Sequence, residues 1–266
     1  MLPVALTVAG SDPSGGAGIQ ADLKTFHQFG VYGEAVITLL TVQNTIRLAR
    51  VECVPAELVM AQLQAVLEDI PPHAAKSGAL ASRETVEALA AAAADFRFPL
   101  VVDPVMISKH GQPLISSEAV AAVRDRLLPQ AFLVCPNVPE AEALTGISVR
   151  TTDDMRSAAK QLREMGAKAA LVKGGHLQDS ALDVLYDGHD WREYVAPRVD
   201  TPHTHGTGCT LSAAITAELA RGTPLDAAVM RAKNYVTQAI RSNPGLGHGS
   251  GPLNHHANTG LKAGTR

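Results

Sequence analysis

The sequence contains few cysteines, and no two of them are close together. Cys53, Cys135 and Cys209 are the three, and none belongs to a CxxC pair. Disulfide-stabilised small domains and structural zinc sites need cysteines paired at short, regular spacing. The sequence therefore argues against both, and we expect each cysteine to be a free thiol.

Long apolar runs and blocks of like charge are also lacking. No apolar stretch approaches the roughly 20 residues that a membrane-spanning helix needs. The apolar run at residues 2–9 has no basic segment before it and no small-residue cleavage site after it, so it predicts a buried strand rather than a signal peptide. The net charge is −3 and the basic residues are scattered, so we expect no nucleic-acid or membrane partner. These absences indicate a cytoplasmic protein.

Strand-like apolar runs alternate with amphipathic stretches along the whole chain. This alternation is typical of an α/β fold, in which helices cover both faces of a central, mainly parallel sheet. The 46% hydrophobic content over 266 residues suffices for one domain, residues 1–266. Asp187-Gly188 predicts a short antiparallel hairpin at one edge of the sheet. We expect an irregular, flap-like segment at 44–54 and a loosely ordered tail at about 244–266.

The individual elements follow from hydrophobic spacing and from turn residues. Strands are expected at 2–9, 35–43, 74–76, 100–103, 131–135 and 169–173, and helices at 19–29, 82–95, 117–128, 152–165, 207–221 and 224–242.

A glycine-containing segment at 205–210 gives the clearest sign of chemistry. Gly206, Thr207, Gly208 and Cys209 open a predicted helix. Unpaired backbone N–H groups at the positive end of a helix attract an anion and would stabilise the negative charge on a transferred phosphoryl group. A thiolate is also favoured in a first helical turn, so Cys209 could accept a proton from a substrate hydroxyl. Taken alone, the segment is as readily a plain loop with a small buried cysteine.

Six motifs occur in a fixed order and together are far more specific than any one of them. They are AGSDPSGGAGIQADLKT at 9–25, VQNT at 42–45, DPVM at 103–106, PNVPEA at 136–141, VKGGH at 172–176 and THGTGCTLSA at 204–213. With these motifs the chain resembles the hydroxymethylpyrimidine/phosphomethylpyrimidine kinases of thiamin biosynthesis, which belong to the ribokinase-like superfamily. The resemblance extends over about residues 3–256.

The resemblance implies a ribokinase-like fold and a small-molecule substrate. ATP, with Mg²⁺, would phosphorylate 4-amino-5-hydroxymethyl-2-methylpyrimidine and then its monophosphate. It places Gly10, Asp22, Gln43 and Val105 at the pyrimidine. The Gln43 amide offers a donor and an acceptor, which match a ring nitrogen beside an amino group. A homodimer is expected, and a requirement for a monovalent cation stays open.

The same resemblance assigns residues to the metal and the nucleotide. Asp103 and Glu140 would supply the hard oxygen ligands that Mg²⁺ prefers. Asn137 and Glu140 form an N-x-x-E pattern similar to the magnesium motif of the superfamily, although alone the pattern is more often a loop and a helix start. Lys173 and Lys233 would approach the nucleotide phosphates as positive charges.

Residues 16–21 offer a competing interpretation, because they fit the G-x-G-x-x-A form of a dinucleotide-binding loop. The first glycine of that motif should directly follow the strand, whereas five residues intervene after Gly10. The second predicted strand ends at Gln43 instead of a ribose-binding acid, and no Gly-Lys-Ser/Thr of a P-loop occurs. An oxidoreductase or a P-loop enzyme is therefore disfavoured.

Three positions depart from the pattern of related kinases. Cys209 stands where most of the superfamily carries an Asp base, which resembles the vitamin-kinase branch. Ser108 stands where relatives that also phosphorylate pyridoxal carry a Cys, and Ala79 replaces a longer apolar residue. Ser108 and Gln43 together favour pyrimidine over pyridoxal. A pyridoxal/pyridoxine kinase stays the nearer alternative, and a non-catalytic pyrimidine-binding protein is disfavoured by the intact 206–209 loop.

Overall fold

The computed structural model describes residues 2–109, 111–175 and 181–261. Strands and helices alternate along most of the chain, as the apolar pattern predicts. In chain order they are β1 (Val4–Ser11), α1 (Gly18–Gln28), β2 (Tyr32–Gln43), β3 (Leu48–Cys53), α2 (Ala56–Asp69), β4 (Ala74–Ser77), α3 (Arg83–Ala93), β5 (Leu100–Val102), α4 (Ser117–Ala122), β6 (Leu133–Val134), α5 (Val138–Thr145), α6 (Thr152–Glu164), β7 (Ala170–Lys173), β8 (Ala181–Tyr186), β9 (Trp191–Ala196), α7 (Thr207–Ala220) and α8 (Leu225–Arg241).

The strands form one sheet in the order β3-β2-β1-β4-β5-β6-β7-β8-β9. Neighbours from β2 to β7 are parallel, and β8 and β9 form the predicted antiparallel hairpin. The segment expected to be a flap at 44–54 is instead mostly β3, which pairs antiparallel with β2. The sheet therefore has an antiparallel pair at each edge. The prediction was wrong here because an exposed edge strand does not show the apolar run of a buried one.

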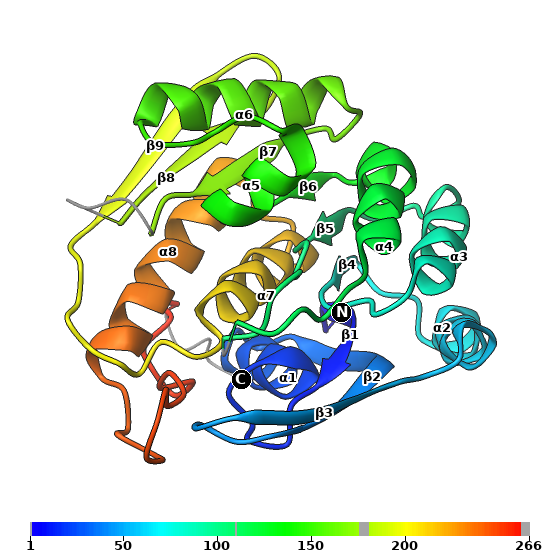
Figure 1. The fold of residues 1–266 in the computed structure, drawn as a ribbon, viewed down its shortest axis with the longest axis horizontal. Coiled ribbons are helices and arrows are strands. Elements are labelled where there is room, and N and C mark those ends of the chain that lie inside the picture. Colours follow the sequence, from blue (N-terminus) through cyan, green and yellow to red (C-terminus); the bar gives the residue numbers. More distant parts are fainter. Residues whose placement is uncertain (1, 110, 176–180, 262–266) are drawn as a thin grey trace.

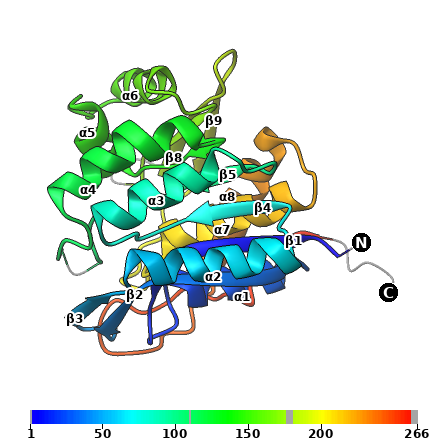
Figure 2. The same cartoon turned by 90° about the vertical axis from the view of Figure 1, so that its right-hand side faces the viewer.

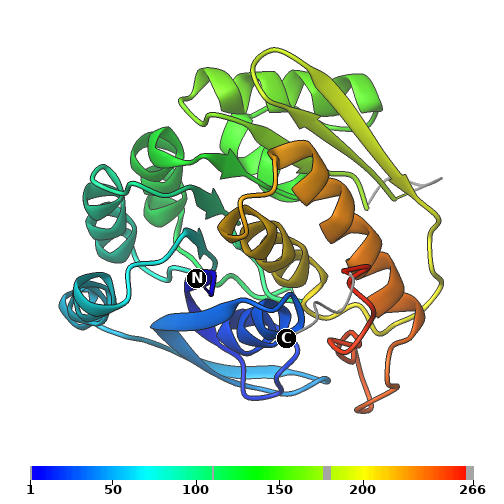
Figure 3. The ribbon, with the colours of Figure 1, turned by 180° about the vertical axis from the view of Figure 1, so that it is seen from behind.

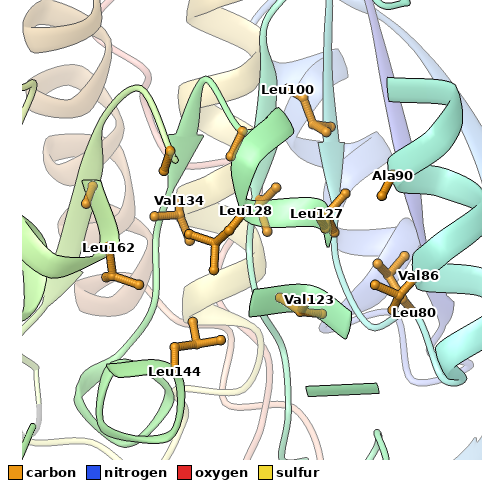
Figure 4. Packing of buried hydrophobic residues seen from close by; sticks show 14 of the residues in the cluster. Leu80, Val86, Ala90, Leu100, Val123, Leu127, Leu128, Val134, Leu144 and Leu162 are labelled. Carbon is orange, nitrogen blue, oxygen red and sulfur yellow. The ribbon is translucent and has the colours of Figure 1, made fainter. Parts of the chain in front are cut away.

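Helices cover both faces of the sheet, as expected (Figures 1 and 2). Helices α2 to α6 bury their apolar side chains on one face, where Leu127, Leu128, Val134 and Leu144 pack together (Figure 4). Helices α1, α7 and α8 cover the other face, with the edge-to-face rings of Phe29 and Tyr235 between α1 and α8. Two layers of helices thus hold the parallel strands with their carboxyl ends at one common edge.

Residues 244–261 pack against the protein instead of forming a loose tail, and residues 262–266 of the predicted tail lie outside the described residues. Leu253 and Ala257 are buried against the core, and the Tyr235 hydroxyl donates to the His255 carbonyl oxygen at 3.0 Å. The Asn254 amide donates to the Ala239 carbonyl oxygen on α8. This segment lies beside α8 in Figure 3. Its glycine-rich composition suggested looseness, but two apolar side chains and several backbone hydrogen bonds hold it as far as residue 261.

Candidate active site

A cavity of about 470 Å³ lies where the carboxyl ends of the strands meet the first turn of α7. Open parallel sheets bind ligands at this edge. The cavity brings together predicted residues from six separate segments of the sequence. All but two of the predicted site residues line it: Gly10, Gln43, Asp103, Val105, Asn137, Glu140, Lys173, Gly206, Thr207, Gly208 and Cys209.

The first turn of α7 is built by a glycine that no other residue replaces easily. Gly206 has a φ of 80°, in the left-handed region, and a Cβ added there would lie 1.8 Å from the Gly16 carbonyl oxygen. The backbones of residues 16 and 206 are therefore in direct contact. Gly208 and Cys209 follow in the first turn and line the cavity, where helix N–H groups have no intrahelical acceptor. The arrangement offers backbone amides and the positive end of the helix dipole to an anion.

Asp12 and His205 fix this turn to the loop after β1, a link that sequence reasoning missed. The Asp12 Oδ2 atom lies 2.8 Å from His205 Nε2 and accepts hydrogen bonds from the Gly16 and Ala17 amides. Its other oxygen accepts from Ser14. Burial alone would raise the pKa of Asp12, but these donors hold it well below its usual range. The signal was the aspartate in a short glycine-rich loop, which often accepts nearby amides.

Asp103 and Lys173 form a buried ion pair beside the α7 entrance. The Lys173 Nζ atom lies 2.9 Å from Asp103 Oδ1, and the Ser212 hydroxyl donates to the other carboxylate oxygen at 3.0 Å. Burial favours protonation of Asp103, but the two lysines Lys173 and Lys76 outweigh it and lower the pKa. Asp103 is therefore ionised and already partly neutralised.

Glu140 and Asn137 form the capping box that starts α5. The Asn137 side chain accepts from the Glu140 amide at 2.9 Å, and the Glu140 carboxylate accepts from the Asn137 amide at 2.8 Å. The N-x-x-E pattern thus has a structural use in this chain. Burial raises the pKa of Glu140 to about 7, although Lys173 opposes the shift. A buried carboxylate that resists ionisation in this way is one that a bound cation would stabilise.

The two carboxylates suit a magnesium ion only as a partial ligand set. Asp103 and Glu140 line the same cavity. Within residues 2–109, 111–175 and 181–261, no cluster of three or more His, Cys, Asp or Glu side chains has a metal-binding arrangement. Mg²⁺ in nucleotide sites is commonly held by one or two carboxylates, with waters and phosphates completing its shell. The residues present fit an ion of that kind. Both carboxylate oxygens of Asp103 already accept hydrogen bonds from Lys173 and Ser212, and the Glu140 carboxylate accepts one from the Asn137 amide.

The Cys209 thiol is not the ready thiolate that its helical position suggests. Burial raises the pKa of this thiol to about 12, although the nearby positive charge of Lys76 opposes the shift. Loss of solvation therefore opposes the helix dipole, which favours a thiolate at this position. The role of Cys209 as a base stays a prediction.

Asp22 does not reach the cavity and is fully buried beneath it. Its carboxylate accepts from the Thr7 hydroxyl at 2.6 Å and from Lys76 Nζ at 2.9 Å. Burial lowers the pKa of Lys76, but the Asp22 carboxylate more than offsets this and raises it. The alternative of a solvated carboxylate is thus wrong, and a direct contact of Asp22 with the pyrimidine stays a prediction. Asp22 instead fastens α1 to β4.

Lys233 is likewise absent from the cavity lining and is engaged elsewhere. Its Nζ atom donates to Asp183 Oδ2 at 2.6 Å, and the other oxygen of Asp183 accepts from the Gly174 amide at 3.1 Å. A direct approach of Lys233 to a nucleotide stays a prediction. Lys233 instead supports the turn after Lys173, so its effect on the site passes through Asp183 and Gly174.

The cavity lining also includes Gln43 and several apolar groups. Gln43 ends β2 there, with Gly10 at the end of the neighbouring β1. A Cβ at Gly10 would lie 2.5 Å from Leu39, so glycine keeps this wall flat. Val105 and Ala79 add apolar surface to the same lining. One cavity thus joins a polar amide, apolar walls and an anion-binding helix entrance.

Comparison with known proteins identifies relatives over nearly the whole chain. The family model described as phosphomethylpyrimidine kinase matches residues 12–254. The thiamine biosynthesis bifunctional protein of Geobacter sulfurreducens is 50% identical over 252 residues, which are 94% of this chain and 51% of that protein. The chain therefore spans about half the length of this bifunctional relative. The hydroxymethylpyrimidine/phosphomethylpyrimidine kinase of Haemophilus influenzae is 48% identical, with 95% of this chain and 96% of that protein covered.

A solved structure agrees with the fold. The pyridoxal kinase of Staphylococcus aureus, in complex with AMP-PCP and pyridoxal, superposes with a TM-score of 0.89 at 34% identity, covering 97% of this chain and 95% of that chain. Sequence and fold thus both relate the chain to kinases.

No helix among the residues that the structure describes is both long and apolar enough to cross a bilayer.

Proposed function

Since the chain belongs to the phosphomethylpyrimidine kinase family, we propose that its cavity phosphorylates 4-amino-5-hydroxymethyl-2-methylpyrimidine with ATP and then converts the monophosphate into the diphosphate. The observation that carries the proposal is the shared cavity of Gln43 and the α7 entrance. One end offers a paired donor and acceptor for an aminated ring. The other offers amides for a phosphoryl group in transfer.

The proposed reaction is an in-line displacement at the γ-phosphorus of ATP. Gln43 binds the amino group and the adjacent ring nitrogen, and Val105 contacts the ring face. The hydroxymethyl oxygen then points toward the first turn of α7, where the amides at Gly206, Thr207, Gly208 and Cys209 meet the negative charge of the transferring group. Such fixed amides contribute because that charge is greatest in the transition state.

Positive charge beside the helix entrance supports the same step. A Cβ at Gly208 would lie 3.3 Å from Lys173 Nζ, so this ammonium is next to the amides of the first turn. We propose that Lys173 contacts the nucleotide phosphates while Asp103 keeps it in place. Asp103 and Glu140 would hold Mg²⁺, which supplies charge neutralisation at those phosphates when bound.

The proton of the acceptor hydroxyl needs a destination, and Cys209 is the proposed one. Its thiol must first ionise, and the charge of Lys76 favours this. Phosphoryl transfer has a loose transition state and depends more on positioning and charge than on a strong base. Cys209 therefore contributes as a general base, in addition to the positioning and charge that the rest of the site supplies.

Pyridoxal kinase is the second candidate activity, because the Staphylococcus aureus neighbour in complex with pyridoxal shares the fold. Ser108 lines the cavity where an aldehyde-capturing cysteine would stand. Serine is a much weaker nucleophile toward an aldehyde than a thiolate, so capture of pyridoxal is not favoured. We propose turnover of pyrimidine well above turnover of pyridoxal.

A coupled assay of ADP release tests the proposal with three acceptors side by side. The pyrimidine alcohol and its monophosphate should each give ADP in the presence of Mg²⁺, with specificity constants at least about tenfold above that for pyridoxal, the ratio given by about 1.4 kcal/mol. Tight pyrimidine binding without ADP release would overturn the kinase assignment. A larger specificity constant for pyridoxal would overturn the substrate assignment.

We also propose that the chain forms a single kinase domain that works in the cytoplasm as a homodimer. Light scattering on the purified protein measures the mass against the 27.9 kDa of one chain. The coupled assay of ADP release, run in potassium and in sodium buffers, measures any monovalent-cation requirement.

A further inference from the structure

The second proposed phosphorylation places an extra charge in the cavity. Its acceptor is a phosphate monoester, which carries about −1.5 to −2 at neutral pH. The cavity wall already contains the carboxylates of Asp12, Asp103 and Glu140. A dianionic acceptor would be repelled by these carboxylates and by the phosphates of ATP. Its binding therefore needs a positively charged side chain that is not already paired with a carboxylate.

Lys109 meets that requirement better than the other lysine of the cavity. Among the described lining residues, Lys109 and Lys173 are the two lysines, and no arginine occurs. Lys173 is nearly buried and bound to Asp103 at 2.9 Å. Lys109 is exposed, and its Nζ atom donates to the neutral Thr204 hydroxyl at 2.8 Å. Within the described part of the chain, Lys109 forms no ion pair.

The position of Lys109 suits a phosphate at the helix entrance. It belongs to the segment between β5 and α4, whose base is closed by backbone hydrogen bonds from Leu114 to Met106 and from Ser108 to Gln112. Its partner Thr204 is two residues before Gly206, the residue that caps α7. The Lys109 ammonium therefore lies beside the first turn of α7, at the edge of the cavity.

We propose that Lys109 is a specificity-determining residue for the second phosphorylation, and that its ammonium exchanges the Thr204 hydroxyl for the phosphate of the monophosphate substrate. This inference rests on the proposed function. The acceptor oxygen of either substrate must reach the same point beside the α7 amides. For the monophosphate, that oxygen belongs to the phosphate group, so its charge lies next to residues 204–206.

The exchange favours the charged substrate over the neutral one. A hydrogen bond between ammonium and phosphate adds the attraction of opposite charges, which the bond from Lys109 to the neutral Thr204 hydroxyl lacks. The alcohol substrate has no charge for Lys109 to meet, so its binding depends on Gln43 and the apolar wall. Lys109 should therefore affect the two acceptors unequally.

The test compares kcat/KM for the alcohol and for the monophosphate in the full-length protein and its Lys109→Met variant. We expect the ratio of monophosphate to alcohol to fall about 10- to 100-fold, as for loss of one charge-assisted hydrogen bond. Lys109→Arg keeps the charge and should restore most of the ratio. The matched control is Lys160→Met, which removes an equally long lysine from exposed α6 and should leave both constants at their original values.

Equal losses with both acceptors in Lys109→Met would overturn the inference, since they would assign Lys109 a general structural role. An unchanged ratio would overturn it too. Unfolding midpoints of the variants separate these results from misfolding, because among the described residues Lys109 has a single side-chain hydrogen bond to lose, to Thr204. If the original protein phosphorylates neither acceptor, the proposed function itself is wrong, and this inference falls with it. Turnover of both acceptors with no change of ratio would contradict the role of Lys109 alone.

Discussion

Cys209 shows how two effects on one side chain compete at the entrance of a helix. The helix dipole favours a thiolate there, whereas burial raises the pKa of the thiol to about 12. The sequence gives the helix position but not the burial, because burial depends on segments that are distant along the chain. The Asp12 to His205 link was missed for the same reason, since 193 positions separate the two residues.

The proposed base role predicts how the rate depends on pH. If the Cys209 thiolate accepts the proton, kcat should rise with pH through neutrality and beyond pH 9, because the raised pKa keeps most of the thiol protonated until then. Cys209→Ala should lower kcat by about 10²-fold at pH 9, the low end for general-base catalysis, and should flatten the profile. Steady-state rates from pH 6 to 10 measure both. Near-normal turnover of Cys209→Ala with the same profile would remove the base role.

Gly206 should be intolerant of a side chain. Gly206→Ala would force a Cβ to 1.8 Å from the Gly16 carbonyl oxygen and separate the two loops. We expect kcat to fall at least about 10²-fold, as when one stabilising donor is lost or misplaced. Gly222→Ala is the matched control, because Gly222 also has a φ of 80° but no atom within 4 Å of an added Cβ. Equal turnover in the two variants would show that the contact at residue 16 has no effect on the site.

At the scale of elements, predicted residues at strand ends and in the first turns of α5 and α7 line one cavity, whereas two predicted residues farther along their helices do not. Gln43, Asp103 and Lys173 meet in one cavity because parallel strands end at one edge of the sheet. Asp22 and Lys233 are on helices, where the orientation depends on what packs against each face. A signal existed for Asp22, since it shares the buried stripe of Ile19 and Phe26. Lys76 in a buried strand was the matching sign of a partner.

The packed C-terminal segment gives a prediction that separates it from a loose tail. Leu253→Ala should lower the free energy of unfolding by about 2–4 kcal/mol, because Leu253 is 2% exposed in the core beside α8. Leu246→Ala is the control in the same segment, with its side chain 60% exposed, and should change stability by less than about 0.5 kcal/mol. Denaturant titration compares the two. Similar small effects in both variants would mean that the segment is loose in solution.

At the scale of the whole molecule, the parallel sheet and the two helical layers follow from hydrophobic patterns that span the chain. The alternation of buried runs and amphipathic stretches predicted the parallel sheet, and Asp187-Gly188 predicted the β8–β9 hairpin. The same patterns did not predict β3, because its residues are mostly exposed and its pairing depends on β2. Short edge strands are set by their neighbours more than by their own composition.

The free energy of unfolding should depend on pH through the buried carboxyl group of Glu34. Burial, assisted by the charge of Asp69, raises the pKa of Glu34 from its ordinary 4.5 to about 7, and its Oε2 atom has no hydrogen-bond partner within the described residues. The folded state therefore favours the protonated form. The benefit is full below about pH 4.5 and is lost as the pH rises through 7.

Glu34→Gln removes that charge and should raise the unfolding midpoint at pH 8 by about 2–4 °C, the shift for roughly 1 kcal/mol in a chain of this size. At pH 5 the gain should largely disappear. Thermal unfolding at both pH values measures it, with Glu68→Gln on the exposed side of α2 as the control. A gain that is equal at pH 5 and pH 8 would show that Glu34 is not the titrating group.

The contact between Gly251 and His205 makes the first turn of α7 depend on three distant parts of the chain. The His205 amide donates to the Gly251 carbonyl oxygen at 3.1 Å, while its ring binds Asp12 in the loop after β1. Cleavage of the backbone near residue 251 would therefore loosen the support behind this turn while the parallel strands stay in place.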